Sequence, residues 1–248
     1  MASGNGNNAG MRAVILAGGT GTRLRPFTTL IPKPLVPLGG RYSVLEIVLL
    51  QLAKAGFTHV TLAVNHLANL IKAYFGDGSK WNIKLDYSVE DTPLSTIGPL
   101  TIIENLPVNF LVMNGDILCN LDFRDFYHHH VASESEVSVS AIRREVHIDF
   151  GVLEYDERGS LQGFVEKPTY TMDVSMGVYC LQRSVVERLE RNRPYGFDTL
   201  MLDGLRYGTR IRVCPFTGYW LDIGRPDDYA RADEHFDELA RHIGVDLP

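Results

Sequence analysis

The sequence lacks several features that would place it in a membrane or outside the cell. Its 248 residues contain no apolar run near the ~20 residues that a transmembrane helix needs. Residues 1–10 are small and polar, without the charged and apolar regions of a signal peptide. We therefore expect a disordered tail over residues 1–10, a cytoplasmic protein and no membrane partner.

Cysteine and basic residues are also scarce. The three cysteines, Cys119, Cys180 and Cys214, are widely spaced and form no Cys-x-x-Cys pair. An odd, scattered set argues against a disulfide framework and against a zinc site. The 24 Lys and Arg are outnumbered by 30 Asp and Glu, which gives a formal charge of −6. Because nucleic-acid binders need a basic face, we expect no nucleic-acid partner, although a local phosphate pocket remains compatible with this charge.

The composition that remains is globular, with 45% hydrophobic and 22% charged residues. Short apolar segments in the first half alternate with helical patterns. The segments read as strands are Met11–Ala17, Val60–Val64, Ile83–Val89 and Asn109–Met113. Alternating strands and helices predict right-handed βαβ units and a mainly parallel sheet, so the fold class is α/β.

The second half has more β-strand character, with a hairpin-type turn at residues 156–159. The expected strands are Val137–Ile142, Gly151–Tyr155, Leu161–Val165, Val178–Leu181 and Ile211–Pro215. The expected helices lie near Ser184–Glu190, Asp198–Tyr207 and Pro226–His242. No linker separates the halves, so we expect a single domain over residues 11–242.

Two polar clusters belong to predicted helices. Ser43 followed by Glu46 is a capping box at the start of an apolar helix that ends near Gly56. His128, His129 and His130 are adjacent, and three adjacent helical residues point in three directions. They therefore cannot all bind one metal ion, and we expect a solvated helix end.

A glycine-rich loop, Gly18-Gly19-Thr20-Gly21-Thr22-Arg23, follows the first strand. In an open α/β sheet, ligands bind at the carboxyl ends of the strands, beside such loops. Glycines let backbone N–H groups approach phosphate oxygens, and an arginine adds a forked cationic contact. The Gly-Lys-Ser/Thr of a Walker A loop is absent, and Leu24 occupies the third glycine position of a dinucleotide fingerprint.

Further charged residues suggest phosphate and metal chemistry. Lys33 lies between two prolines that restrict the backbone and could aim its ammonium group at a phosphate. Asp116 follows a buried-type strand and suits a hard cation such as Mg²⁺, although it could equally cap the next turn. Asp222 lies in an apolar run, where an acid is costly unless paired or metal-bound. Glu166 and Lys167 end another strand and could contact a sugar and its phosphate, or form an exposed ion pair of little value.

These motifs together resemble those of the sugar-1-phosphate nucleotidyltransferase family. The resemblance rests on GGTGTRLRPFT…PKPLVPLGG, NGD, FVEKP and WLDIGRPDDY, in the family's order, and runs from about Met11 to His242. It implies a Rossmann-like α/β/α sandwich with a mixed, mainly parallel sheet, similar to the GT-A fold. It also implies formation of an NDP-sugar and pyrophosphate from an NTP and a sugar 1-phosphate, with Mg²⁺ as cofactor.

The resemblance also implies residue roles. Nucleotide-binding residues would be Leu16, Ala17, Gly18, Gly19, Gly21, Thr22, Arg23, Glu90, Ser95 and Asp116. Catalytic residues would be Arg23, Lys33 and Lys167, and the metal ligands would be Asp116 and Asp222. Sugar-phosphate-binding residues would be Gly151, Glu166, Lys167 and Ser175. The N-terminal half would thus hold the nucleotide and the C-terminal half the sugar phosphate.

Base and sugar are suggested by the segment around Glu90, which resembles the guanylyltransferase form. A carboxylate can accept from guanine N1–H and the exocyclic amine together. Ser95 stands where the family usually has Gly, and Ser175 where many members have Asn. We expect GTP with a mannose- or heptose-type 1-phosphate. The alternatives are UTP, dTTP or CTP, or an idle NDP-sugar-binding regulator. Hexapeptide repeats are absent, so no C-terminal β-helix is expected, and homo-oligomer formation is left open.

Overall fold

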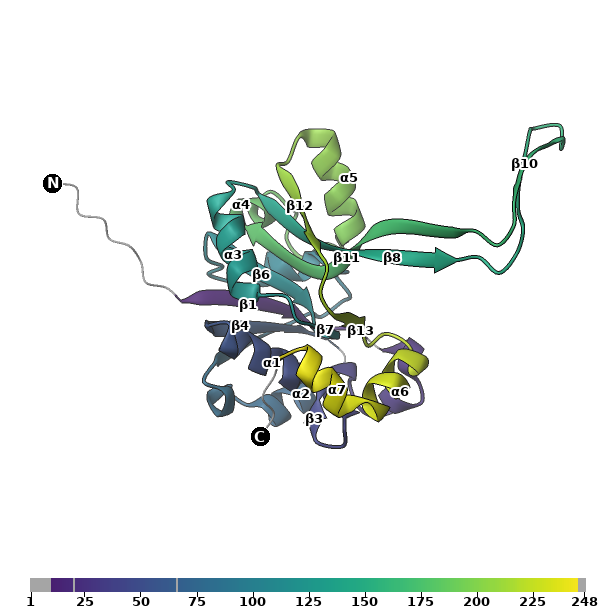
Figure 1. The fold of residues 1–248 in the computed structure, drawn as a ribbon. Helices are drawn as coiled ribbons and strands as arrows, with labels where there is room; N and C mark the ends of the chain where they lie inside the picture. The colour runs from purple at the N-terminus through teal and green to yellow at the C-terminus, as the bar shows by residue number, and fades with distance from the viewer. Residues whose placement is uncertain (1–9, 20, 66, 245–248) are drawn as a thin grey trace.

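A seven-stranded mixed sheet forms the centre of the computed structural model, which describes residues 10–19, 21–65 and 67–244 (Figure 1). The strand order is β12-β8-β11-β6-β1-β4-β5. These strands are β1 (Met11–Leu16), β4 (Phe57–Val64), β5 (Lys84–Val89), β6 (Asn109–Asn114), β8 (Val137–His147), β11 (Thr169–Gln182) and β12 (Ile211–Phe216). The expected tail lies outside the described residues, apart from Gly10.

Strands β6, β1, β4 and β5 are mutually parallel, as the alternating pattern predicted. Strand β11 is antiparallel to both of its neighbours, β6 and β8, and β12 is parallel to β8. The sheet is therefore mixed and mainly parallel, which confirms the predicted fold class. Its parallel half places the carboxyl ends of β1, β4, β5 and β6 at one edge, where an open α/β sheet binds its ligands.

Helices cover both faces of the sheet. Ala13 and Ile15 of β1 face a core built with α1, α2, α3, α6 and α7, whereas Val14 faces the core with η5, α4 and α5. Helix bounds are α1 Val44–Lys54, α2 Ala68–Phe75, α3 Phe123–Ala132, α4 Arg183–Glu187, α5 Phe197–Tyr207, α6 Pro226–Glu234 and α7 Phe236–His242; η5 is Gly98–Ile102. Among the described residues, no helix is both long and apolar enough to cross a membrane.

Helix α1 begins as predicted, but only half of its capping box forms. The Ser43 hydroxyl accepts from the backbone N–H of Glu46 at 3.2 Å. The Glu46 side chain does not return to the cap; it accepts from Lys80 Nζ at 2.8 Å and from Tyr74 at 3.2 Å. Because Glu46 is buried, this pairing with a cation offsets its desolvation and ties α1 to the α2 region.

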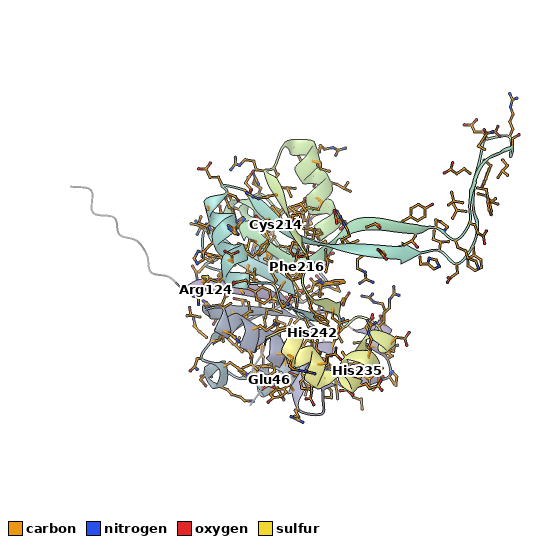
Figure 2. The ribbon with its side chains drawn as sticks, in the orientation of Figure 1. Glu46, Arg124, Cys214, Phe216, His235 and His242 are labelled. Atoms are coloured by element: carbon orange, nitrogen blue, oxygen red, sulfur yellow. The ribbon has the colours of Figure 1, made fainter. Side chains whose placement is uncertain are left out.

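The C-terminal helix predicted over Pro226–His242 is wrong in one respect, since it is two helices. The chain breaks at His235, whose φ of −105° and ψ of 33° are not helical (Figure 2). The break turns Phe236 into the core, where its ring stacks on Tyr42 at 6.1 Å between centroids and fills the space beside Gly39. Burial of this aromatic side chain therefore outweighs helix continuity.

Strands β8 and β11 extend well past the ends predicted from the sequence. Their outer halves form a two-stranded ribbon that leaves the body of the molecule and ends in the hairpin β9 (Val152–Tyr155) and β10 (Leu161–Val165) (Figure 1). We call residues 143–173 the arm. The sequence reading missed its length because polar residues such as Arg143 and Arg144 interrupt the apolar pattern.

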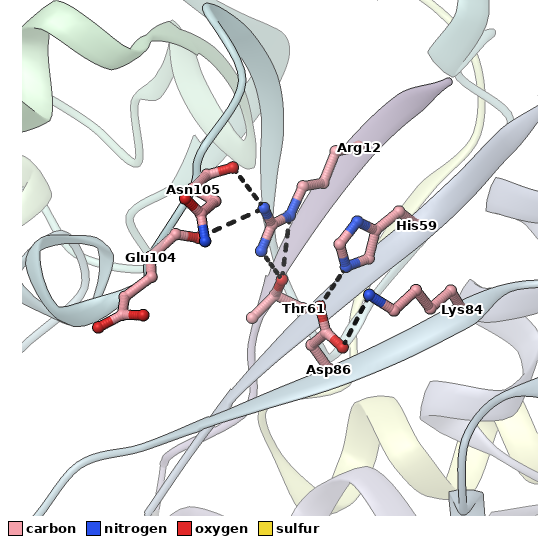
Figure 3. Close-up of polar contacts among 7 residues, drawn as sticks. All are labelled: Arg12, His59, Thr61, Lys84, Asp86, Glu104 and Asn105. Carbon is pink, nitrogen blue, oxygen red and sulfur yellow. Dashed lines mark hydrogen bonds and ion pairs between the residues drawn. The ribbon is translucent and has the colours of Figure 1, made fainter. Parts of the chain in front are cut away.

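A polar cluster around Arg12 joins strands β1, β4 and β5 (Figure 3). The buried Arg12 guanidinium donates to Thr61 Oγ1 at 2.7 Å and to the carbonyl oxygen of Asn105 at 2.8 Å. Beside it, His59 pairs with Asp86, which also contacts Lys84. These contacts satisfy a buried cation, so we assign the cluster to the stability of the sheet.

The expectation of a solvated histidine end holds for only part of α3. His128 and His129 are exposed, but His130 is buried against β8, with its Nδ1 2.8 Å from Ser138 Oγ. The three side chains point in different directions, and the direction of the third is toward the core. Burial lowers the pKa of His130 to about 4.

This burial predicts an acid-sensitive contribution to stability. The folded pKa of His130 lies below its unfolded value of about 6.5, so the unfolded chain binds more protons between pH 6.5 and 4. The free energy of unfolding should fall across that window as pH falls, by at most about 3 kcal/mol. Urea titrations at several pH values should show the fall in the wild type and a flatter profile for His130→Gln. A matched His128→Gln variant should keep the wild-type slope; equal slopes for all three proteins would contradict this role.

Candidate active site

A two-stranded sheet outside the central one brings the two candidate metal ligands together. Strand β7 (Ile117–Cys119) pairs antiparallel with β13 (Trp220–Asp222), which sets Asp222 opposite Ile117. The backbone N–H of Ile223 donates to the carbonyl oxygen of Asp116 at 3.0 Å. Asp116 and Asp222, distant in sequence, therefore lie side by side at the edge where the parallel strands end.

The charges around this pair are unequal. Asp222 has a raised pKa because it is partly buried and because the Asp116 carboxylate lies nearby; Lys33 and Arg23 act in the opposite direction. Lys33 Nζ forms an ion pair with Asp116 Oδ2. Lys33 thus neutralises the Asp116 carboxylate, whereas the surroundings of Asp222 disfavour its charged form.

Each of the two aspartates has one carboxylate oxygen that could bind a cation. Asp116 Oδ1 and Asp222 Oδ1 are buried and have no hydrogen-bond partner among the described residues. Those residues also contain no cluster of three or more His, Cys, Asp or Glu side chains able to hold a metal ion. Mg²⁺ is commonly bound by one or two carboxylates together with substrate phosphates and water. The pair therefore fits a magnesium ion whose coordination the substrate completes.

A cavity of about 630 Å³ opens at the carboxyl ends of β1, β4 and β6. It contains all of the predicted nucleotide-binding residues and Lys33. Its lining is Leu16, Ala17, Gly18, Gly19, Gly21, Thr22, Arg23, Lys33, Pro34, Ala63, Asn65, Glu90, Pro93, Ser95, Thr96, Pro99, Asn114, Gly115, Asp116 and Gly224. The glycine loop, the basic side chains and Asp116 thus share one space, and Gly224 brings the Asp222 strand to its rim.

Glycine is required at two positions of this loop. A Cβ atom on Gly18 would lie 2.9 Å from Glu90 Oε1, so a side chain there would displace the carboxylate. Gly21 has a φ of +63°, and its carbonyl oxygen accepts from Thr28 Oγ1 at 2.6 Å. Glycine adopts that backbone readily, and a Cβ atom added to Gly21 would lie 2.9 Å from Thr28 Cγ2 and 3.2 Å from Lys33 Cβ.

Glu90 lines the same cavity and lies directly after β5. It is buried, and its Oε2 accepts from the backbone N–H of Leu94 at 2.8 Å. Burial raises the pKa of Glu90, while the Leu94 hydrogen bond acts against that rise. One oxygen is thereby anchored, and Oε1 lies close beside Gly18 on the cavity wall, where a base could donate to it.

Ser95 occupies the turn after Glu90 in a left-handed conformation, with φ of 66°. L-residues other than Gly, Asn and Asp rarely adopt this region, at a cost of roughly 1–2 kcal/mol. Glycine would make this turn without the strain. The Ser95 hydroxyl points toward Gly196, where an added Cβ would lie 3.4 Å from it.

Ser95→Gly should stabilise the protein by about 0.5–1 kcal/mol, since relief of strain exceeds the added entropy of the unfolded chain. Urea unfolding measures the difference. Asn192→Gly is the matched control, since Asn192 has φ of 60° but tolerates it better, and its gain should be smaller. A loss of stability in Ser95→Gly would show that its side chain contributes more than its backbone costs.

The sequence reading missed several residues that line the cavity. Asn65 directly follows β4, and Asn114 is the last residue of β6. The next residue, Gly115, donates its N–H to the carbonyl oxygen of Leu16 at 3.0 Å. Asn114 also packs closely against Gly177, where a Cβ would lie 2.6 Å from its Nδ2. Polar residues at the carboxyl ends of parallel strands are the signal that would have identified both asparagines.

The predicted sugar-phosphate residues lie elsewhere. Gly151, Glu166 and Lys167 belong to the arm, where a Cβ on Gly151 would lie 3.2 Å from Glu166 Oε2. Ser175 lies at the root of the arm, with its Oγ 3.2 Å from the Tyr179 hydroxyl. None of the four lines the cavity. Within one chain, the structure brings the nucleotide half of the predicted site together but leaves the sugar-phosphate half apart from it, and these four roles stay predictions.

Comparison with known proteins places this geometry in context. The model of the family described as "Nucleotidyl transferase" matches residues 12–238. The "Mannose-1-phosphate guanyltransferase" of Schizosaccharomyces pombe is 33% identical over 228 residues, which cover 88% of this chain and 62% of that protein. The chain thus spans about three fifths of the length of the curated relatives that it matches.

Solved structures agree with the fold. HddC from Yersinia pseudotuberculosis, complexed with GMP-PN, superposes with a TM-score of 0.69 and 30% identity, covering 91% of this chain and 99% of that one. A putative glucose-1-phosphate thymidylyltransferase from Bacillus anthracis gives a TM-score of 0.72 at 21% identity, covering 96% and 97% of the two chains. The second match, at this lower identity, supports the fold alone.

Proposed function

Since this chain belongs to the nucleotidyl transferase family, and to its sugar-1-phosphate branch, we propose that it forms an NDP-sugar and pyrophosphate from an NTP and a sugar 1-phosphate. We further propose GTP and a mannose- or heptose-type 1-phosphate as its substrates, and Mg²⁺ as its cofactor. The observation that carries the proposal is the meeting of Asp116 and Asp222 beside a cavity that the glycine loop and Lys33 line.

The residues of this cavity suit a transfer that needs no covalent intermediate. An oxygen of the sugar 1-phosphate forms a bond to the α-phosphorus of the NTP, and the bond from that phosphorus to the β-phosphate oxygen breaks, releasing pyrophosphate. The nucleophile is already ionised, so the protein has to align two polyanions and neutralise their charge. Arg23 and Lys33 lie on the cavity wall, where they would hold the triphosphate and stabilise the leaving group.

The glycine loop and the aspartates complete this arrangement. Backbone N–H groups around Gly18 and Gly21, which line the cavity, would approach phosphate oxygens. Asp116 and Asp222 would hold Mg²⁺, which when bound neutralises phosphate charge and polarises the α-phosphate. Until substrate arrives, Lys33 pairs with Asp116 and offsets part of the charge of the acidic pair.

The preference for GTP is supported by the geometry of Glu90 and by the relatives. Its buried carboxylate is anchored through one oxygen and presents the other toward the cavity. A guanine can donate two hydrogen bonds to a carboxylate, whereas uracil and thymine offer one N–H. The guanyltransferase names of the relatives and the GMP-PN complex of HddC favour the same base.

A pyrophosphate-release assay tests the proposal. It crosses ATP, CTP, GTP, UTP and dTTP with a panel of sugar 1-phosphates, with and without Mg²⁺. We expect release with GTP and mannose or heptose 1-phosphate, dependent on Mg²⁺. Release confined to UTP or dTTP would overturn the choice of base. Thermal stabilisation by a GDP-sugar without release for any pair would instead identify an idle nucleotide-sugar binder.

A further inference from the structure

The arm carries many exposed apolar side chains, and near its root the Arg144 guanidinium lies over the ring of Trp220 on the body, 5.4 Å from the centroid. It projects from the body in Figure 1, and its side chains stand free on both sides in Figure 2. Its exposed large hydrophobic residues are Val146, Phe150, Leu153, Tyr155, Leu161, Phe164, Val165, Tyr170 and Met172. Phe150 is 79% exposed and Tyr155 is 71% exposed. Large apolar side chains gathered on one projecting segment mark an interaction site.

An isolated ribbon of two strands is also a poor structure by itself. In the part of the chain that the structure describes, β9 and β10 pair only with each other, and the outer halves of β8 and β11 do the same. Two-stranded ribbons are marginally stable in water unless a further strand or an apolar face covers them. The arm therefore needs a surface that its own chain does not supply.

The arm begins at the edge of the sheet where the cavity opens. Strand β11 runs antiparallel to β6, so its outer half continues beyond the carboxyl end of β6. Gly177, at the start of the buried part of β11, packs against Asn114 of the cavity wall. Gly151, Glu166 and Lys167 lie further out, where the ribbon meets the terminal hairpin.

The ribbon keeps these residues from reaching their own cavity. Pairing of β8 with β11 is continuous over seven residue pairs, from Ala141 opposite Ser175 to His147 opposite Thr169. At about 3.3 Å per residue, this carries the hairpin roughly 20 Å outward from the root of the arm. The N–H of Ile148 still donates to the carbonyl oxygen of Pro168 at 3.0 Å, so the ribbon holds up to the hairpin.

We propose that two copies of this chain exchange arms, so that each nucleotide cavity is completed by Gly151, Glu166 and Lys167 of the other copy. The inference rests on the proposed function, because it assigns the sugar-phosphate half of that site to the partner. A second copy of the chain suits both observations. Its surface would cover the exposed apolar side chains of the arm, and its nucleotide cavity would receive the sugar-phosphate residues that the arm carries. An unrelated partner would leave Lys167 without a phosphate to bind.

Mixing two inactive variants tests the exchange directly. Asp116→Asn disables the cavity and leaves the arm intact, and Lys167→Met disables the arm and leaves the cavity intact. In a mixed dimer with exchanged arms, one site combines both defects and the other combines both intact halves. Co-refolding at equal amounts should therefore restore about a quarter of the wild-type rate of pyrophosphate release, because half of the dimers are mixed and one of their two sites is intact.

The outcomes separate the alternatives. No recovery from two dimeric variants, or full activity of Lys167→Met alone, would overturn the composite site. An arm that folds back onto its own cavity gives no recovery, because every chain then carries a defect. A wild-type protein that dimerises through the arm but releases no pyrophosphate with any substrate pair would instead defeat the proposed function.

Mass in solution tests the exchange without any activity. Light scattering should give about 55 kDa for the wild type, twice the 27.7 kDa of one chain. Tyr155→Asp with Leu161→Asp places two charges opposite each other on the outer hairpin and should give a single-chain mass. Val108→Asp is the control, because Val108 is 63% exposed on the body and should keep the dimer. A single-chain wild type, or a dimer that survives the arm variant, would overturn the proposal.

Discussion

Asp222→Asn should lower the rate of pyrophosphate release by about 1,000-fold or more, because removal of one charge from a two-carboxylate cation site weakens transition-state stabilisation by several kcal/mol. The substitution keeps the shape of the side chain, so the pairing of β13 with β7 should persist. The rate is measured under saturating GTP, sugar 1-phosphate and Mg²⁺. Asp227→Asn is the control, since Asp227 is an exposed acid at the start of α6, and it should retain the wild-type rate.

The same variant should also have a higher melting temperature than the wild type in the absence of metal. Asp222 is partly buried beside a second carboxylate, and its buried Oδ1 has no hydrogen-bond partner among the described residues. A neutral amide removes the like-charge repulsion. Asp116→Asn should not gain in this way, because Asp116 also loses its ion pair with Lys33. Retained turnover in either variant would refute the metal role, and a marked fall in the melting temperature of Asp222→Asn would refute the electrostatic account.

The proposed metal site has a test that does not depend on turnover. A Mg²⁺ titration in the presence of GTP alone should raise the melting temperature of the wild type, since binding to the folded state stabilises it by mass action. That rise should be lost in Asp222→Asn and retained in Asp227→Asn. An equal rise in all three proteins would place the ion on the triphosphate alone.

Much of the parallel half of the fold could be predicted from the sequence. Buried parallel strands such as β1 and β4 are short apolar runs, and their alternation with helices leaves few topologies. The glycine loop and Glu90 follow such strands, so their positions at the carboxyl edge came with the strand assignments. The residues that line the cavity, proposed as the nucleotide half of the site, were therefore within reach of local patterns.

Other features depend on distant parts of the chain. The meeting of Asp116 with Asp222 was expected only through the family resemblance, because it needs the pairing of two three-residue strands, β7 and β13, and so short a segment carries no periodic signal. The break at His235 depends on a pocket for Phe236 beside Tyr42. The arm also lacks a signal, because an exposed ribbon shows no alternation between a buried and a solvated face.

Glu90→Gln should reduce the specificity constant for GTP by about 100- to 1,000-fold, because each orientation of the amide leaves two donors facing each other. If its oxygen accepts from Leu94 N–H, as Glu90 Oε2 does at 2.8 Å, its NH₂ group meets the N–H groups of guanine. If it is reversed, the NH₂ group meets Leu94 N–H. The fold should persist, since burial already raises the pKa of Glu90 and a neutral side chain suits the site.

The decisive measurement for Glu90→Gln is the ratio of specificity constants for GTP and UTP. The amide can donate to a uracil carbonyl, so UTP should lose less than GTP and the ratio should fall. Asp91→Asn is the control, since Asp91 is the exposed neighbour of Glu90 and should leave the ratio unchanged. If Glu90→Gln weakened both nucleotides equally, the carboxylate would act by holding the turn at Leu94, and recognition of guanine would have to come from other groups in the cavity.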